Sequence, residues 1–207
     1  MVPRPRIIRR NIFLSNHGAG RYFWPVDHDD GAMYYEDTQN VYLYAGLKSG
    51  LGSHSIAYES SLLFWPDAEE SGAGGIGGFS AGSNYQDATN ASGYNEQWRN
   101  NTVLFASPSS AAIWYLGQCN EATVSAPMAP DTWPVADNNT FIITGGANAL
   151  HIQCGPVVVN YSQWCAIGQD HASVVLDAAP SDDTLANAAR RLLGLDAGCE
   201  ITGGCGR

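Results

Sequence analysis

The chain has 207 residues, which suits one domain of ordinary size with a real hydrophobic core. Charged residues are sparse, glycine is abundant and the formal net charge is −10. This balance favours short strands joined by many turns over a helical bundle. Because so acidic a surface repels phosphate groups, the composition argues against nucleic acids and anionic membranes as partners. No apolar run of about 18 residues occurs, so no membrane-spanning helix is predicted.

The start of the chain is basic but lacks the apolar stretch of a signal peptide. We expect either an intracellular protein or a chain whose true N-terminus lies further upstream. The cysteines and glycosylation sequons described below bear on that choice.

A short phrase recurs along the chain: a polar corner that contains Asn or Ser, followed by an apolar strand. It occurs at residues 10–14, 39–44, 60–65, 100–105 and 138–143. The spacings are 29, 21, 40 and 38 residues. One turn of a β-helix takes roughly 20 to 30 residues, so the longer spacings would hold two turns or a loop. Asn tolerates the left-handed backbone of a sharp corner, and its amide can bond to the backbone or to an Asn stacked one coil away.

These repeats predict an all-β fold, a right-handed parallel β-helix, with its coils in residues 1–160. The alternative is an antiparallel β-sandwich with Asn-containing turns. A Gly-rich segment at about residues 70–83 interrupts the repeats. It lacks the Lys and the following helix of a phosphate-binding loop, and we interpret it as a flexible surface loop between coils.

Residues 161–207 are predicted to form a helical cap and a Cys-containing tail. One helical turn would begin with Ser162 as its N-cap. The stronger helix spans residues 181–194, with Ser181 as N-cap, acids in its first turn, and arginines and Gly at its end. A helix after the last coil would cover the open sheet edge, which a solenoid must protect.

Cysteines and sequons favour an oxidising, secretory context. Sequons of the form Asn-x-Ser/Thr occur at Asn90, Asn100, Asn138 and Asn160. The five cysteines show no zinc-ligand spacing. We expect Cys119 to pair with Cys154, and Cys199 to pair with Cys205 or Cys165. The odd count leaves one thiol free or bonded to another chain.

The most distinctive local feature is an acidic cluster made of Asp27, His28, Asp29, Asp30 and Gly31. The cluster, the aromatic residues after it and the phrase at residues 40–43 resemble a family of right-handed parallel β-helix proteins. That family includes glycoside hydrolases of the β-xylosidase-like kind. The tail, with Trp164, residues 168–170 and Ser173, is similar to the end of secreted algal-type relatives. The resemblance covers residues 10–195.

The resemblance implies a catalytic nucleophile at Asp29 or Asp30, with Asp27 also possible. The family's acid/base Glu matches Leu51 in this chain. Glu36 and Glu59 are the candidates to replace it. Loss of a positioned general acid costs about 10² to 10⁴ in rate, so the resemblance transfers the fold better than the reaction.

Other roles for the cluster stay open. The Asp residues can cap a turn, or they can form a Ca²⁺ site, because clustered carboxylates suit a hard cation. His17, His28 and His54 are interpreted as structural rather than as a transition-metal triad. Tyr34 and Tyr35 can stack on sugar rings, or they can belong to the core or to an interface. The predicted binding residues are Asp27, His28, Tyr34, Tyr35 and His54, and no cofactor other than Ca²⁺ is expected.

The sequence therefore predicts a secreted, carbohydrate-associated β-helix protein, weakly catalytic or non-catalytic, that serves a wall, matrix or surface appendage. The alternative is a divergent retaining glycoside hydrolase that uses the acidic cluster. Expected partners are a polysaccharide or a glycoprotein. A protein partner, or upstream chain, is also expected at the N-terminal coil, because an uncapped coil presents free strand edges.

Overall fold

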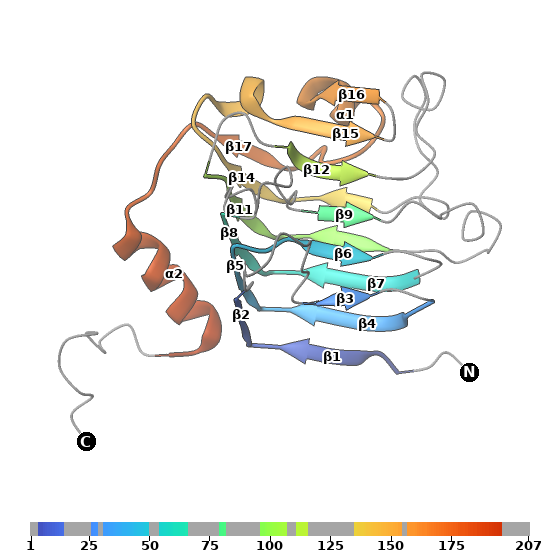
Figure 1. Ribbon diagram of the computed structural model, residues 1–207, viewed down its shortest axis with the longest axis vertical. Helices are drawn as coiled ribbons and strands as arrows, with labels where there is room; N and C mark the ends of the chain where they lie inside the picture. The colour runs from blue at the N-terminus through green and yellow to red at the C-terminus, as the bar shows by residue number, and fades with distance from the viewer. Residues whose placement is uncertain are drawn as a thin grey trace, which may run out of the picture.

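The computed structural model describes residues 4–14, 26–28, 31–49, 54–65, 79–81, 96–106, 111–115, 135–154 and 157–195. These residues form mostly β-strands with few helices, which makes the protein all-β (Figure 1). The strands stack along the long axis of the molecule, with β1 (Arg6–Arg9) at one end and β16 (Val157–Asn160) at the other.

The described strands form three sheets, each built from roughly every third strand of the chain. The first sheet contains β1, β4 (Met33–Thr38), β7 (His54–Glu59), β10 (Gln97–Arg99) and β13 (Val135–Asp137). The second contains β2 (Ile12–Leu14), β5 (Val41–Leu43), β8 (Leu62–Phe64), β11 (Thr102–Leu104), β14 (Thr140–Ile142) and β17 (Val174–Leu176). The third contains β3 (Asp27–His28), β6 (Leu47–Ser49), β9 (Phe79–Ala81), β12 (Ala111–Tyr115), β15 (His151–Cys154) and β16.

Strand pairing is parallel throughout the described sheets, with one exception. The exception is the last pair, in which β15 and β16 run antiparallel. The expected alternative of an antiparallel β-sandwich is therefore wrong, because such a sandwich requires antiparallel neighbours in both sheets. In their hydrogen bonding the three sheets are open, and each ends in an edge strand at both sides.

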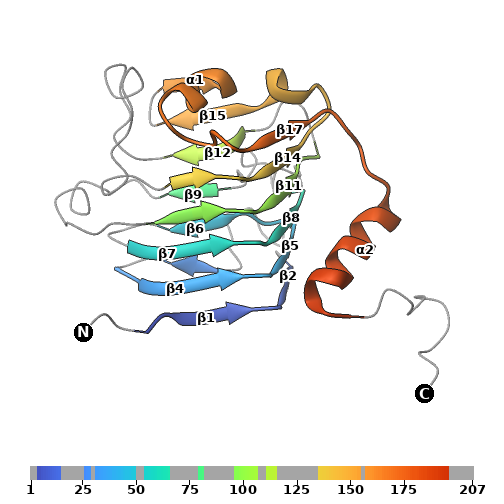
Figure 2. The same ribbon diagram turned by 180° about the vertical axis from the view of Figure 1, so that it is seen from behind.

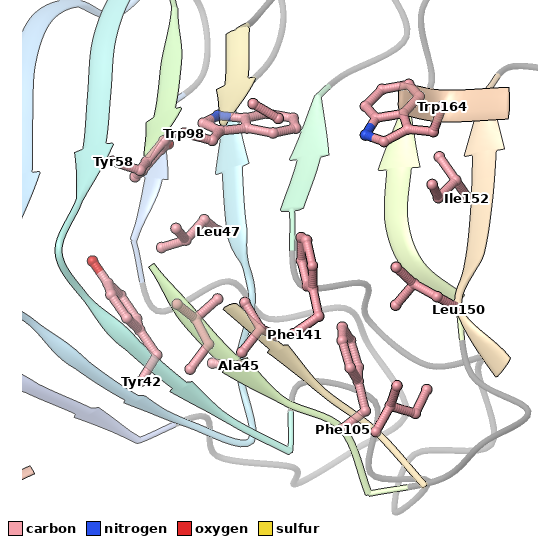
Figure 3. Packing of buried hydrophobic residues seen from close by; sticks show 14 of the residues in the cluster. Tyr42, Ala45, Leu47, Tyr58, Trp98, Phe105, Phe141, Leu150, Ile152 and Trp164 are labelled. Carbon is pink, nitrogen blue, oxygen red and sulfur yellow. The ribbon is translucent and has the colours of Figure 1, made fainter. Parts of the chain in front are cut away.

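Side chains from all three sheets meet in one hydrophobic core (Figure 3). Strands alternate their side chains between two faces. In the second sheet, for example, the middle residue of each strand points inward, and Tyr42, Leu63 and Phe141 are fully buried. Phe13 stacks on Tyr42 with ring centroids 5.0 Å apart. The stacked register therefore places apolar residues of successive strands in columns that fill the interior.

The corner between the first and second sheets is only two residues long, and its first residue adopts a left-handed backbone. This residue has a φ of 58° at Arg10, 56° at Gln39, 52° at Ser60, 58° at Asn100 and 55° at Asn138. Such angles are costly for most residues and cheapest for Gly and Asn. The prediction of a sharp left-handed corner is confirmed, and the left-handed position is the residue before the stacked Asn.

The second corner residue forms a ladder of hydrogen bonds, which we call the corner ladder: Asn11, Asn40, Ser61, Asn101 and Asn139. The backbone N–H of Asn11 donates to Asn40 Oδ1 at 3.0 Å, and that of Asn40 donates to Ser61 Oγ at 3.1 Å. The backbone N–H of Ser61 donates to Asn101 Oδ1, and the backbone N–H of Asn101 donates to Asn139 Oδ1, each at 3.0 Å. The amides of Asn40, Asn101 and Asn139 also donate to strand carbonyls at 2.9 Å, those of Ile8, Tyr58 and Trp98. The predicted stacking of Asn side chains is confirmed.

The C-terminal end of the ladder is closed by residues 167–173. Gln169 Oε1 accepts the backbone N–H of Ala136 at 2.8 Å, and the N–H of Asp170 donates to the Ala136 carbonyl at 2.6 Å. These two bonds satisfy the edge of β13. The buried Asp170 carboxylate accepts from Asn139 Nδ2 and Trp164 Nε1, each at 2.9 Å, and from Ser173 Oγ at 2.6 Å. The tail thus supplies the polar groups that a further strand would otherwise provide.

The first helix, α1 (Tyr161–Ala166), begins earlier than the sequence predicted. Its N-cap is Asn160, not Ser162, because Asn160 Oδ1 accepts the N–H of Gln163 and the Gln163 side chain accepts the N–H of Asn160. Trp164 of this helix is buried in the core beside Leu150 and Ile152 (Figure 3). A short 3₁₀ helix, η2 (Gly146–Ala149), precedes β15.

The second helix, α2 (Asp182–Leu193), confirms the predicted Ser181 N-cap and the left-handed Gly194 at its C-cap. Its position differs from the expectation. It lies along the outer face of the second sheet rather than over the last strand, as both views show (Figures 1 and 2). Leu185 packs there with Val41, Phe64 and Leu104. The reason is that the outer rows of the second sheet are themselves apolar and need cover.

The Gly-rich segment also departs from its prediction. Residues 79–81 form β9, which pairs with β6 and β12 in the third sheet. The interpretation of the whole segment as a loop is therefore wrong at these three residues, and residues 70–78 and 82–83 lie outside the described part of the chain. The glycine-rich sequence around β9 gives no strand signal of its own, and the strand forms because it pairs with β6 and β12.

The corner ladder leads to a stability prediction. Asn101→Ala removes the acceptor of Ser61 N–H and the donor to the Tyr58 carbonyl, so it leaves two buried backbone groups without partners. We expect a loss of about 3 kcal/mol in the free energy of unfolding, measured by urea denaturation. The control is Asn100→Gly, which keeps the left-handed corner and should change stability by less than about 0.5 kcal/mol. Equal effects of the two variants would contradict the ladder's role.

Candidate functional site

A cavity of about 360 Å³ opens on the outer face of the first sheet. We call it the first-sheet groove. Residues of β4 and β7 supply most of its wall. The lining residues are Pro5, Tyr34, Tyr35, Glu36, Thr38, Ser55, Ile56, Ala57, Glu59 and Gln97. The groove combines two carboxylates, two tyrosines and three neutral polar side chains, so it is a polar, aromatic-lined site.

Strand alternation explains why both carboxylates reach the groove. Asp37 and Tyr58 are fully buried and pair in register, so their neighbours along each strand point outward. Glu36 pairs with Ala57 and Thr38 pairs with Glu59, which makes Glu36 and Glu59 diagonal neighbours. Strands about 4.8 Å apart with a rise of about 3.3 Å per residue put the two Cα atoms roughly 8 Å apart.

Two left-handed residues shape the start of the groove. Tyr34 has a φ of 59° and Ser55 has a φ of 55°. They occupy matching places on neighbouring strands, between the register pairs Met33–His54 and Tyr35–Ile56. A left-handed non-Gly residue costs roughly 1 to 2 kcal/mol. Tyr34 and Tyr35 both belong to the cavity lining, and the Tyr35 ring also packs against the core.

Arg6 fixes the Tyr35 ring at the N-terminal side of the groove. Its Nη1 donates to the Tyr35 hydroxyl at 3.0 Å, and its guanidinium lies 5.4 Å from the ring centroid. Among the residues that the structure describes, neither Glu36 nor Glu59 forms an ion pair. Arg99 stands beside Glu59 in register on the next strand. The two carboxylates can therefore accept hydrogen bonds from hydroxyl groups of a ligand.

The predicted binding residue His28 lies in the interior and does not line the groove. It is buried, and its Nε2 is hydrogen-bonded to the Asp37 carboxylate. Its ring lies 4.4 Å from that of Tyr35 and 5.7 Å from that of Tyr58. His28 therefore supports β4 from the core side, behind the groove wall.

Burial and the nearby Asp37 raise the pKa of Tyr42, so this core phenol stays neutral.

The acidic cluster is described only in part. Asp27 belongs to β3 and His54 to β7. The candidate nucleophiles Asp29 and Asp30, and Leu51 at the family's acid/base position, lie outside the described residues. Their catalytic role and a Ca²⁺ role stay predictions. Within the described ranges no group of three His, Cys, Asp or Glu residues could hold a metal ion.

The sequons have a structural explanation at two positions. Asn100 and Asn138 are the exposed left-handed corner residues, and each is followed by a ladder Asn and then by an outward-facing Thr at the start of a strand. The fold alone therefore generates the pattern Asn-Asn-Thr. Asn160 is exposed and caps α1, and Asn90 lies outside the described residues. Glycosylation at any of them stays a prediction.

The predicted disulfides fall mostly outside the described chain. Cys119, Cys199 and Cys205 are not described, and Cys154 belongs to β15. Cys165 is a free, half-buried thiol whose sulfur lies 3.7 Å from the Asp170 carbonyl. Because Cys199 lies outside the described residues, its pairing with Cys165 or Cys205 stays a prediction. Burial raises the pKa of Cys165, and burial likewise raises that of Asp170 against three hydrogen bonds that lower it.

Comparison of the chain with family models, curated proteins and solved structures finds no match. Neither α-helix in the described part of the chain is long and apolar enough to cross a membrane.

From the sequence, the groove carboxylates Glu36 and Glu59 are considered only as candidates to replace the acid/base Glu. Counting back from the corner phrases puts Glu36 three residues and Glu59 one residue before a left-handed corner, which assigns both to the outward face.

A stability measurement tests whether His28 supports β4 through its buried pair with Asp37. His28→Ala leaves the Asp37 carboxylate buried without its partner, and we expect a loss of about 3 to 5 kcal/mol in the free energy of unfolding. The exposed His171→Ala is the control and should be neutral in the same urea titration. If His28→Ala left stability unchanged, the pair would not support β4.

Proposed function

We propose that this chain is a secreted, carbohydrate-associated protein whose first-sheet groove binds a polysaccharide, with weak or no catalysis. The observation that carries the proposal is the groove itself, with Glu36 and Glu59 beside Tyr34 on one face. Sugars present hydroxyl groups at their edges and apolar C–H faces above and below the ring. Carboxylates accept the hydroxyl protons, and aromatic faces cover the C–H groups.

We further propose that the three sheets are the faces of a right-handed parallel β-helix. The strand order, in which successive strands enter different sheets, and the corner ladder support this arrangement. In such a solenoid the outer rows run on along the stack. The row of Thr38 and Glu59 continues to Arg99 and Asp137. A linear polymer can follow these rows, so a chain of several sugar units suits the face better than a single sugar.

The proposed setting is extracellular, with the protein serving a wall, a matrix or a surface appendage. The net charge of −10, the sequons and the cysteines support it. A Ca²⁺ ion at the acidic cluster and disulfides in the C-terminal half belong to the same proposal.

A second candidate function, glycoside hydrolysis, is favoured by the spacing of the groove carboxylates. The Cα atoms of Glu36 and Glu59 stand roughly 8 Å apart, and two Glu side chains that leave one face of a sheet at this spacing can bring their carboxyl groups to the separation of about 6.5 to 9.5 Å that an inverting pair needs. One carboxyl would protonate the leaving oxygen, and the other would activate water. A retaining reaction would instead use Asp29 or Asp30.

Binding is tested by glycan-array screening, followed by calorimetry on the best oligosaccharide. Glu36→Gln with Glu59→Gln should weaken affinity at least tenfold, because charged acceptors form the stronger hydrogen bonds. Tyr34→Ala should also weaken it, whereas the control Tyr44→Ala should not. Tyr44 has a φ of 55°, so both substitutions remove a left-handed tyrosine and only Tyr34 lines the groove. Unchanged affinity in the Glu double variant would refute the proposal.

Hydrolysis is tested on the same oligosaccharide by following release of reducing ends and the anomer formed first. The inverting mechanism predicts an inverted product and a loss of at least a hundredfold in Glu36→Gln or Glu59→Gln. A retained product, lost in Asp29→Asn or Asp30→Asn, would move the reaction to the acidic cluster. If binding occurs but no substrate is cleaved, the second candidate fails and the first stands.

A further inference from the structure

The two ends of the strand stack differ in how their edges are satisfied. At the C-terminal end, Gln169 and Asp170 bond to the edge of β13, and α1 lies over the last strands. At the N-terminal end, β1, β2 and β3 are the edge strands of their sheets. In the described part of the chain no strand pairs with their open side. We call the exposed side of β1 and β2, with its corner, the N-terminal edge.

The corner ladder gives the N-terminal edge an open acceptor. Each backbone N–H in the ladder donates to the side chain of the next coil, as Asn11 donates to Asn40. Asn11 Nδ2 also donates to Asn40 Oδ1, at 3.2 Å. Among the described residues, no donor reaches Asn11 Oδ1, and Asn11 is exposed. The ladder therefore stops with its acceptor pointing toward a coil that the described residues do not supply.

The outer apolar rows of the second sheet end at β2 in exposed side chains. Ile12 is 59% exposed, whereas its register partner Val41 is 2% exposed; Leu14 is 63% exposed, whereas its partner Leu43 is half-buried. Because Asn11 uses its carbonyl to bond to Val41 N–H, alternation turns the backbone N–H and C=O groups of Ile12 and Leu14 toward the open side. The edge thus offers unpaired backbone groups flanked by exposed apolar side chains.

Charge identifies the kind of segment that fits. Four exposed arginines crowd this edge: Arg4, Arg6, Arg9 and Arg10. The chain has only 10 Lys and Arg in total, and its first acidic residue is Asp27. A basic rim on a protein of net charge −10 disfavours pairing of two N-terminal edges, since their arginines repel. The tail bonded to β13 likewise disfavours stacking of one copy onto the end of another.

We propose that the N-terminal edge binds an extended acidic segment of another polypeptide as one more parallel coil. The segment pairs its backbone with Ile12 and Leu14, donates a corner N–H to Asn11 Oδ1, and places carboxylates beside Arg6 and Arg9. Apolar residues of the segment cover Ile12 and Leu14. Main-chain bonds supply affinity and the arginines supply selection by charge.

The test uses a labelled peptide and fluorescence anisotropy at low salt. The probe is the nonapeptide Glu-Ile-Ile-Glu-Glu-Asn-Ile-Phe-Leu, which is the sequence of residues 6–14 with its three arginines replaced by Glu. The matched control peptide keeps the arginines. We expect the acidic peptide to bind at least tenfold more tightly than the basic one. The protein variant Arg6→Glu, Arg9→Glu, Arg10→Glu should reverse that preference.

A second variant keeps the test valid if charge reversal disturbs the fold. Ile12→Pro removes an edge N–H that faces away from β5, so it should leave the unfolding temperature unchanged and reduce acidic-peptide binding at least tenfold. Equal binding of the two peptides, or unaltered binding by Ile12→Pro, would overturn the proposal. So would self-association of the protein through this edge in sedimentation, which would make a second copy the occupant.

Discussion

The corner ladder is the interaction on which the rest of the structure depends. A two-residue corner forces one residue into a left-handed backbone and leaves inward-pointing polar groups on the next. The stacked side chains of Asn40, Ser61, Asn101 and Asn139 satisfy those groups and tie each corner to the next one in the stack. Because each described corner between the first and second sheets is two residues long, the register of the strands on both sides of it is fixed. Core columns and outer rows then follow from strand alternation alone.

The groove is a consequence of that register. Glu36 and Glu59 come from the neighbouring strands β4 and β7, and because both strands end in the same two-residue corner, the two residues lie on one face at a fixed diagonal. Behind them, Asp37 is held by His28 inside the core. The same corner register fixes the position of Ile12 and Leu14 in β2, the edge strand at which the stack of described strands ends. A binding face along the stack and a pairing edge at its end are therefore distinct surfaces of one scaffold.

Much of this arrangement was predictable from the sequence. The recurring corner phrase predicted the stacked asparagines and strands, and Ser181 with Gly194 predicted α2, because both depend on local backbone chemistry. The position of α2, the Asn160 cap and β9 were missed, because tertiary contacts decide them: the apolar outer rows of the second sheet, the reciprocal bond with Gln163, and two flanking strands. His28 was assigned to binding from its acidic neighbours, and burial beside Asp37 decides its place instead.

The central claim, that the outer face of the first sheet recognises a sugar polymer, is tested most directly by a crystal structure of the protein with a bound oligosaccharide. The account predicts electron density for sugar rings across β4 and β7, with hydroxyl groups within hydrogen-bond distance of Glu36 and Glu59 and a ring face against Tyr34. Density for the sugar on another face, with an empty groove, would contradict it.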